Sequence, residues 1–451
     1  MILSDFNKLF DNMYDSEKKR RRHGTAIKLL DGASYPMHEE LETLPAGPQD
    51  EFFLQKFIRQ FFGKEGVNAT EIGTHPDFID LESGNGEIKY HYVCTIFVDI
   101  VGSTRLSLLY PLENVYLFKN AVIKTCIEVI RSFDGYVHRI MGDAVMAFFG
   151  GNHTSKENSI ADSINCAVTL RAILEGNIKP WMIRNGMDEK DFGFRVGCDF
   201  GDDDKVLWGS FGYKHVGEVS AAGLSVDMAS KLQGLANKNQ TMLGQGLLDF
   251  VNWPEEYSNI KKKKKGETKE PLPVVSPNLT DSNGSPINYR MRLLDYYNCL
   301  RFSALPRKLR ENIGKSGVID NPAIHYTCYV KLNDGRYKYI SASEFLEKNI
   351  SLEFEVLVNT RTRISFPLKV VFTKTNHGPE TPEEERDINY DPIIKYMHKK
   401  KTSKFNSSTP KFCKVTLNEA TLYRSLHTMK CEIYDSNGHN IFRDWIGVMI
   451  K

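Results

Sequence analysis

The chain has 451 residues, and its 59 Lys and Arg residues nearly balance its 57 Asp and Glu residues. Because 41% of the residues are hydrophobic, the composition excludes a disordered or collagen-like protein, and the length predicts about two or three domains. No apolar stretch approaches the ~18 residues that a membrane-spanning helix needs. The first 15 residues lack the pattern of a secretory signal, so we expect a cytoplasmic protein without a membrane span.

The eight cysteines show neither a C-x-x-C motif nor the spacing of a metal site. Four of them lie inside apolar runs: Cys94, Cys126, Cys166 and Cys198. We expect these four to be small core residues in a reducing compartment.

Residues 1–88 form an N-terminal segment to which no chemistry is assigned, with an apolar helical stretch at 52–62. Residues 89–254 alternate apolar runs with amphipathic stretches, which predicts an α/β domain, a layered sandwich of helices and strands. Strands are expected at 92–99, 136–140, 144–149, 192–199, 205–211 and near 240, and helices at 112–133, 159–174, 223–235 and before 251.

Residues 255–287 contain five consecutive lysines, Lys261 to Lys265, and four prolines. This composition predicts a linker, because like charges repel and proline interrupts regular elements. Residues 288–451 show short alternating runs separated by turn signals such as Asp334-Gly335 and Asn437-Gly438. They predict a mostly β domain, a sandwich led by one helix near 305–313.

The last region and the rest of the chain carry opposite net charges. Residues 288–451 contain 27 basic and 18 acidic residues, a net charge of +9, whereas the remainder has 32 basic and 39 acidic residues, a net charge of −7. We therefore expect the two parts to meet different partners.

The end of the predicted strand 92–99 begins the most informative segment. Asp99 precedes a small-residue turn, Gly102-Ser103-Thr104, that leads toward a helix, and Asp143 lies 44 residues later in the turn of a predicted hairpin. Backbone N–H groups at such a turn bind phosphate. Two carboxylates beside it suit two Mg²⁺ or Mn²⁺ ions on a triphosphate, with the backbone carbonyl of Ile100 as a further ligand. Taken singly, each Asp is equally a helix-capping or turn residue.

This layout resembles the class III nucleotidyl cyclase catalytic domain over about residues 90–251, through the segments 97–104, 139–150 and 223–232. The resemblance implies a homodimer in which each of two active sites takes residues from both chains. It also implies that Asp99 and Asp143 bind two divalent metal ions. In that family, the ribose 3′-oxygen attacks the α-phosphorus of a nucleoside triphosphate, and pyrophosphate leaves.

The resemblance places three residues at base-reading positions: Phe97, Arg139 and Ser220. Adenylate cyclases have Lys and guanylate cyclases have Glu at the position of Arg139. The absence of that Glu disfavours guanine. Because Arg139 only donates hydrogen bonds, it suits the acceptor-rich edge of cytosine or uracil. The Ser220 hydroxyl serves either base, and Phe97 supplies apolar contact. The alternatives are a surface ion-pair residue for Arg139, a helix-flanking Ser220 and a core Phe97.

The family's ribose-orienting Asn and transition-state Arg fall here on Asp227 and Lys231. Lys231 keeps the positive charge for the pentavalent phosphate, and Asp227 accepts a hydrogen bond from ribose. Their spacing of four residues on one helix also suits an ion pair between them. Lys214 or His215 is a further candidate for binding the β- and γ-phosphates.

With an arginine at position 139, the chain resembles the pyrimidine cyclases of bacterial Pycsar anti-phage systems. Those enzymes make cyclic CMP or cyclic UMP and carry a C-terminal sensor domain. Residues 431–451 fit the closing hairpin of that domain. The resemblance implies a product read by a separate effector protein. The basic C-terminal region suits a phage-derived or nucleic-acid trigger, or it is a basic lid packed on the acidic cyclase part.

Three further functions stay open at this point. The first is an adenylate cyclase with an unusual base pocket, the second is a catalytically silent nucleotide sensor, and the third is a nucleic-acid-binding protein led by the C-terminal domain. Retention of both metal aspartates opposes the silent sensor, whereas the departures at Asp227 and Lys231 favour it.

Overall fold

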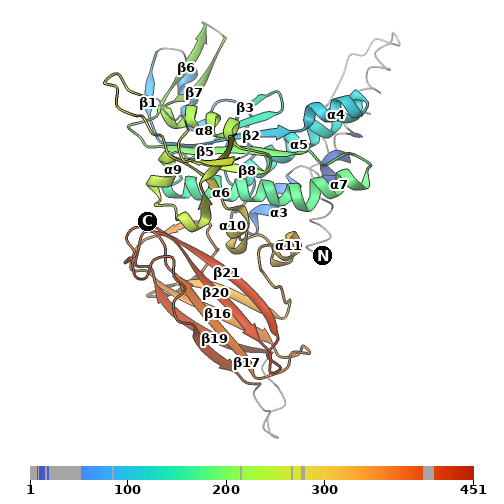
Figure 1. Ribbon diagram of the computed structural model, residues 1–451, viewed down its shortest axis with the longest axis vertical. Coiled ribbons are helices and arrows are strands. Elements are labelled where there is room, and N and C mark those ends of the chain that lie inside the picture. The colour runs from blue at the N-terminus through green and yellow to red at the C-terminus, as the bar shows by residue number, and fades with distance from the viewer. Residues whose placement is uncertain are drawn as a thin grey trace, which may run out of the picture.

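The computed structural model describes residues 52–399 and 411–451, apart from 84–85, 214–215, 266–267 and 276–279, together with 8, 10–15 and 18–19. The described chain has an α/β part and a sandwich of strands, which Figure 1 shows above and below one another. Among the described helices, none has the length and apolarity to cross a membrane.

A seven-stranded sheet in the order β3-β4-β2-β5-β8-β12-β9 is the centre of the α/β part. The strands β2 and β5 near its centre are buried along most of their length, because the sheet is covered on both faces. Neighbouring strands run antiparallel except β5 and β8, which are parallel. The strands are β2 (Val93–Val101), β3 (Tyr136–Met141), β4 (Ala144–Phe149), β5 (Gly193–Gly201), β8 (Gln240–Gly244), β9 (Ser258–Asn259) and β12 (Met291–Leu294).

Alternate residues of β2 point into two different cores, as the period of a strand requires. Cys94, Ile96 and Val98 join the large core beneath α5 and α6, whereas Val93 and Phe97 join a smaller one under β6, β7 and α8. The helical segments are α3 (Phe53–Arg59), η1 (Pro76–Ser83), α4 (Ser103–Leu109), α5 (Leu112–Ser132), α6 (Lys156–Ile173), η2 (Leu174–Ile178), α7 (Lys179–Arg184), α8 (Leu224–Leu235), α9 (Gln245–Phe250) and η3 (Glu255–Tyr257). The four cysteines expected in the core are buried and free.

A three-stranded sheet stands apart from the main one at the upper edge of Figure 1. It consists of β1 (Ile88–Tyr90), β6 (Leu207–Tyr213) and β7 (Val216–Ala222). The strands and helices predicted for residues 89–254 are present, while β1, β7, α4 and α7 were not predicted. β1 is short, and β7, with the sequence VGEVSAA, has few large apolar residues, so the hydrophobic period of both strands is weak.

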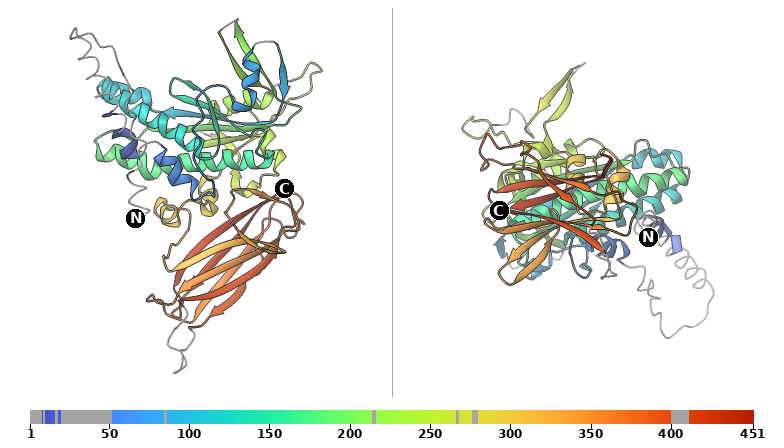
Figure 2. Two further views of the ribbon diagram at one scale, coloured as in Figure 1. Left: turned by 180° about the vertical axis from the view of Figure 1, so that it is seen from behind. Right: turned by 90° about the horizontal axis from the view of Figure 1, so that it is seen from below.

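Residues 255–287, which were predicted to be a linker, contain a β-hairpin in the structure. Lys261–Lys265 forms β10, which pairs with β11 (Thr268–Leu272) in a hairpin that projects from the sheet in the right-hand view of Figure 2. The register sets Glu270 opposite Lys263, and Lys262, Lys263 and Lys264 are exposed, so solvent screens the repulsion that the prediction relied on. Beyond the hairpin, β12 pairs with β8 and completes the α/β sheet, although residues 288–451 were assigned to the β-rich part.

The C-terminal part is the predicted sandwich. Its two sheets have the orders β14-β13-β16-β19 and β15-β21-β20-β17-β18, and their inner faces enclose one apolar core. The elements are α10 (Tyr296–Phe302), α11 (Arg307–Ile313), β13 (Ile324–Leu332), β14 (Gly335–Tyr339), β15 (Phe345–Leu346), β16 (Ser351–Asn359), β17 (Leu368–Thr375), β18 (Ile393–Met397), β19 (Phe412–Ala420), β20 (Ser425–Tyr434) and β21 (Asn440–Ile450). The expected helix is α11, and α10 was not predicted.

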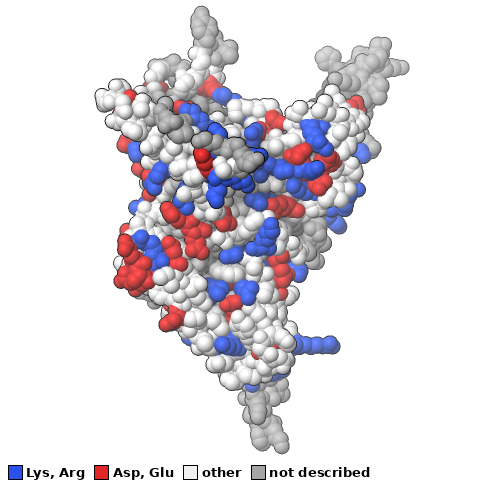
Figure 3. All heavy atoms as spheres, in the orientation of Figure 1, with Lys and Arg blue, Asp and Glu red and all other residues white. Residues whose placement is uncertain are grey.

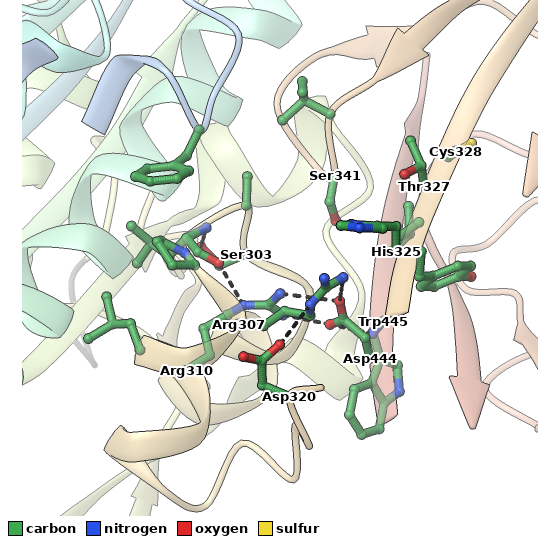
Figure 4. Close-up of a pocket in the computed structure, with 18 of the residues that line it drawn as sticks. Ser303, Arg307, Arg310, Asp320, His325, Thr327, Cys328, Ser341, Asp444 and Trp445 are labelled. Atoms are coloured by element: carbon green, nitrogen blue, oxygen red, sulfur yellow. Dashed lines mark hydrogen bonds and ion pairs between the residues drawn. The ribbon is translucent and has the colours of Figure 1, made fainter. Parts of the chain in front are cut away.

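A cavity of about 400 Å³ lies where α11 meets the sandwich (Figure 4). Arg310 donates from Nη1 to Asp444 Oδ1 at 2.8 Å, and both side chains are almost fully buried. Arg307 contacts the same Asp444 at 3.6 Å and Asp320 at 3.2 Å. These pairs fix α11 against β21, since a buried charge must keep its partner.

We predict that Asp444→Asn destabilises the C-terminal part by about 3–5 kcal/mol, because it leaves the buried Arg310 charge uncompensated. Thermal unfolding and hydrogen exchange in β21 measure the loss. The exposed pair Arg290–Asp249 supplies the control, since Arg290→Gln should cost less than about 1 kcal/mol. Equal shifts for both variants would contradict a structural role for the buried pair.

Candidate functional site

The two predicted metal-binding aspartates lie at neighbouring strand ends. Asp99 is near the end of β2, and the register places it opposite Ala144, the residue that follows Asp143. The Ile100 amide donates to the backbone carbonyl of Asp143 at 3.3 Å, which ties the hairpin turn to β2. The Asp99 and Asp143 side chains are 14% and 29% exposed, so solvent ions reach both.

Each carboxylate is held through a single oxygen. Asp99 Oδ2 accepts from Arg195 Nε at 2.9 Å and Nη2 at 2.5 Å. Asp143 Oδ2 accepts from the Ser103 hydroxyl and lies 3.6 Å from Lys119 Nζ. Within the described residues, neither Oδ1 atom accepts a hydrogen bond. Accessible carboxylate oxygens without a protein donor are the hard ligands that divalent cations prefer, so these residues fit a metal pair.

Arg195 and Lys119 were not identified from the sequence. Arg195 stands directly opposite Asp99 on β5, and the only signal was a charged residue inside the apolar run 192–199. Both cations neutralise the aspartates and keep their side chains oriented.

The turn after β2 has one conformation that only glycine accepts. Gly102 has a φ of +88°, and a Cβ atom there would lie 2.6 Å from the Asp191 carbonyl oxygen. The turn directs Ser103 to Asp143, whereas Thr104 is exposed. The Ile100 side chain is buried, so its backbone carbonyl is the group left to act as a ligand.

The predicted base-reading residues form a second group. Arg139 on β3 makes an ion pair through Nη2 with Glu218 Oε1 on β7. Ser220 lies two residues further along β7 and is 9% exposed. Phe97 is buried in the small core together with Trp208 and Val226, which agrees with the core alternative for this residue. Glu218 was not identified, because the sequence gives no sign that β7 approaches β3.

Asp227 and Lys231 are both exposed on α8. In the part of the chain that is described, no ion pair joins them, and no hydrogen bond links either side chain to the aspartates. The alternative of a mutual ion pair is therefore not realised. Lys214 and His215 lie outside the described residues.

One other group of metal-type ligands, Glu256, His377 and Asp387, lies where η3 meets the sandwich. Both ring nitrogens of His377 are engaged, Nδ1 with Asp387 at 2.6 Å and Nε2 with the Tyr257 hydroxyl at 3.2 Å. The group therefore serves as a contact between the two parts of the chain.

Two known protein families match parts of this chain. Residues 87–271 match the adenylate and guanylate cyclase catalytic domain, and residues 307–451 match the adenylyl/guanylyl and SMODS C-terminal sensor domain. A cytidylate cyclase of Escherichia coli is 41% identical over 435 residues, which is 95% of this chain and 93% of that protein. The chain belongs to the cytidylate cyclase family.

A cytidylate cyclase of Staphylococcus aureus is 30% identical over 450 residues, covering 98% of this chain and 96% of that protein. Among solved structures, the adenylyl cyclase CyaB from P. aeruginosa aligns with 47% of this chain and 95% of its own, at 16% identity and a TM-score of 0.37. The predicted combination of a nucleotide cyclase and a C-terminal sensor domain is confirmed, and with it the enzyme class, a nucleotidyl cyclase.

Proposed function

We propose that this chain converts CTP to 3′,5′-cyclic CMP and pyrophosphate. The observation that carries the proposal is the 41% identity to a cytidylate cyclase over 95% of the chain. The donor-only side chain of Arg139 supports a pyrimidine, because cytosine presents acceptors at N3 and O2. UTP is the alternative substrate.

The reaction joins the ribose 3′-oxygen to the α-phosphorus and breaks the bond from that phosphorus to pyrophosphate, with loss of the 3′-hydroxyl proton. Two divalent cations, Mn²⁺ or Mg²⁺, bound at Asp99 and Asp143 supply Lewis acidity to the 3′-oxygen and the triphosphate. The Oδ1 atoms of Asp99 and Asp143 and the Ile100 carbonyl would hold these ions. Arg195 and Lys119 keep the carboxylates oriented.

Two residues of α8 complete the proposed site. Lys231 donates to the charge that develops around the α-phosphorus, without the bidentate fork of an arginine. Asp227 accepts a hydrogen bond from the ribose. The backbone of the turn Gly102, Ser103 and Thr104 faces the triphosphate, and Lys214 is a further phosphate ligand in this proposal.

We propose a homodimer, because among the described residues no hydrogen bond or ion pair joins the metal-binding residues Asp99 and Asp143 to the base-reading residues Arg139 and Ser220. Large apolar side chains near the metal group are exposed: Leu108 by 84%, Leu112 by 74% and Tyr116 by 62%. On the α8 side, Leu224 is 53% exposed. Exposed apolar side chains gathered beside a site mark an interface, and joining two chains brings Asp99 and Asp143 of one toward Arg139, Ser220, Asp227 and Lys231 of the other.

We further propose that cyclic CMP is a second messenger of bacterial antiviral defence, read by a separate effector protein. The match to a sensor domain supports a trigger that acts on residues 307–451. A phage-derived molecule or nucleic acid is the proposed trigger, and the net charge of +9 over residues 288–451 suits an anion. On the face drawn in Figure 3, acidic and basic side chains are interspersed over the sandwich, which favours a localised contact.

The first test incubates the purified chain with Mn²⁺ and each of ATP, GTP, CTP and UTP, and identifies products by mass spectrometry. We expect cyclic CMP as the main product. Cyclic UMP as the main product would identify UTP as the substrate. Cyclic AMP as the main product would refute the proposal that Arg139 recognises a pyrimidine base. No product from any nucleotide, with and without phage lysate, would favour the silent sensor.

We predict that Asp99→Asn and Asp143→Asn each lower cyclase activity at least 100-fold, because each removes a charge that holds a cation. The variants should keep the wild-type circular dichroism spectrum. Asp281→Asn, in a surface turn outside the site, controls for the loss of one carboxylate. Wild-type turnover in either site variant would exclude the two-metal assignment.

Mixing Asp99→Ala chains with Lys231→Ala chains tests the shared site. Each homodimer is inactive, but a heterodimer keeps one intact site and should recover about half of the wild-type activity. The matched control mixes Asp99→Ala with Asp143→Ala, where both changes fall on the metal side of each chain and no site is restored. Absence of recovery in a purified heterodimer of the first pair would contradict a site built from two chains.

A further inference from the structure

The ion pair between Arg139 and Glu218 places a guanidinium, which only donates hydrogen bonds, beside a carboxylate, which only accepts them. Arg139 comes from β3 of the main sheet and Glu218 from β7 of the small sheet. The two side chains are 43% and 42% exposed, so a ligand can reach both. Glu218 and Ser220 lie on the same face of β7, because side chains two apart share a face of a strand.

Two described groups lie beside the Glu218 carboxylate, Arg139 and His138. His138 has Nε2 at 4.0 Å from Glu218 Oε2. Burial lowers the pKa of His138, so the imidazole is neutral at pH 7 and adds no positive charge. Among the described residues, Arg139 is the one cation paired with this carboxylate.

The two pyrimidines differ where this pair would meet them. Cytosine presents an N4 amino donor beside the N3 acceptor, whereas uracil presents an O4 acceptor beside an N3–H donor. A carboxylate accepts from the cytosine amino group, and it repels the uracil O4 because neither atom carries a proton. Arg139 donates to cytosine N3 and O2, but it meets a donor at N3 of uracil.

We infer that Glu218 is the specificity-determining residue that selects cytosine over uracil, by accepting a hydrogen bond from the N4 amino group while Arg139 donates to N3 and O2. The inference rests on the proposed function and extends it to the choice between two pyrimidines. Adenine presents the same order as cytosine, so ring size must exclude ATP.

A simpler role for Glu218 is to hold Arg139 in place. If Glu218 only positions Arg139, loss of the carboxylate lowers kcat/KM for every nucleotide by the same factor. If Glu218 determines specificity, the ratio of kcat/KM for CTP to that for UTP changes. The CTP-to-UTP ratio of kcat/KM therefore distinguishes the two roles.

The experiment compares kcat/KM for CTP and UTP in the wild type, Glu218→Gln and Glu218→Ala. The Gln amide can rotate to donate to uracil O4, so we expect the CTP-to-UTP ratio to fall roughly 10- to 100-fold in Glu218→Gln. Glu87→Gln makes the same chemical change at an exposed position before β1 and should leave the ratio unchanged.

An unchanged ratio in Glu218→Gln would overturn the inference and leave Glu218 as a positioning residue. A wild type that prefers UTP would overturn it as well. Cyclic AMP as the main wild-type product would refute the proposed function, yet a lowered CTP-to-UTP ratio in the variant would still support the role of Glu218. Equilibrium binding of CTP and UTP to the same proteins gives the ratio if turnover is absent, and equal binding ratios in wild type and variant would overturn the inference.

Discussion

The hydrogen bonding of β2 to β4 on one side and to β5 on the other determines where the charged groups of the metal site lie. The register puts Arg195 opposite Asp99 and carries the hairpin turn with Asp143 to the same sheet edge. A slip of one residue would turn Asp99 into a core and expose Val98 or Ile100. The two apolar cores that take alternate residues of β2 make such a slip costly. The packing that fixes the register of β2 therefore also fixes the positions of the charged residues in the site.

Charge balance follows from that register. Two carboxylates at a strand edge repel each other, and Arg195 and Lys119 offset the repulsion in the absence of bound ions. Because each cation contacts only Oδ2, the carboxylates keep an open oxygen without losing their orientation. The base-reading residues are arranged in a similar way, since Arg139 and Glu218 neutralise each other and both side chains still reach solvent.

Local patterns predicted the parts of the molecule that local chemistry determines. The apolar run ending at Asp99, the Gly142-Asp143 turn and the amphipathic helix now seen as α8 all came from residues close in sequence, and the spacing of the aspartates led to the cyclase family. Arg195 and Glu218 lie 96 and 79 residues from Asp99 and Arg139. The pairing of β2 with β5 brings the first pair together, and the packing of the small sheet beside β3 brings the second pair together. The lysine run was misjudged for a different reason, because backbone pairing within a local hairpin outweighs the repulsion of solvated side chains.

Replacing the expected tether by paired strands changes how force passes between the two parts. β12 is hydrogen-bonded to β8, and a single residue, Asp295, separates β12 from α10 and caps that helix. Tyr296, Cys299 and Leu300 of α10 are packed in the large core. A flexible tether would let the sandwich turn independently, whereas α10 also packs in one core with Met449 of β21. A rotation of the sandwich would therefore load α10 and the adjoining strand β12, and β8 alone lies between β12 and the strand that carries Arg195.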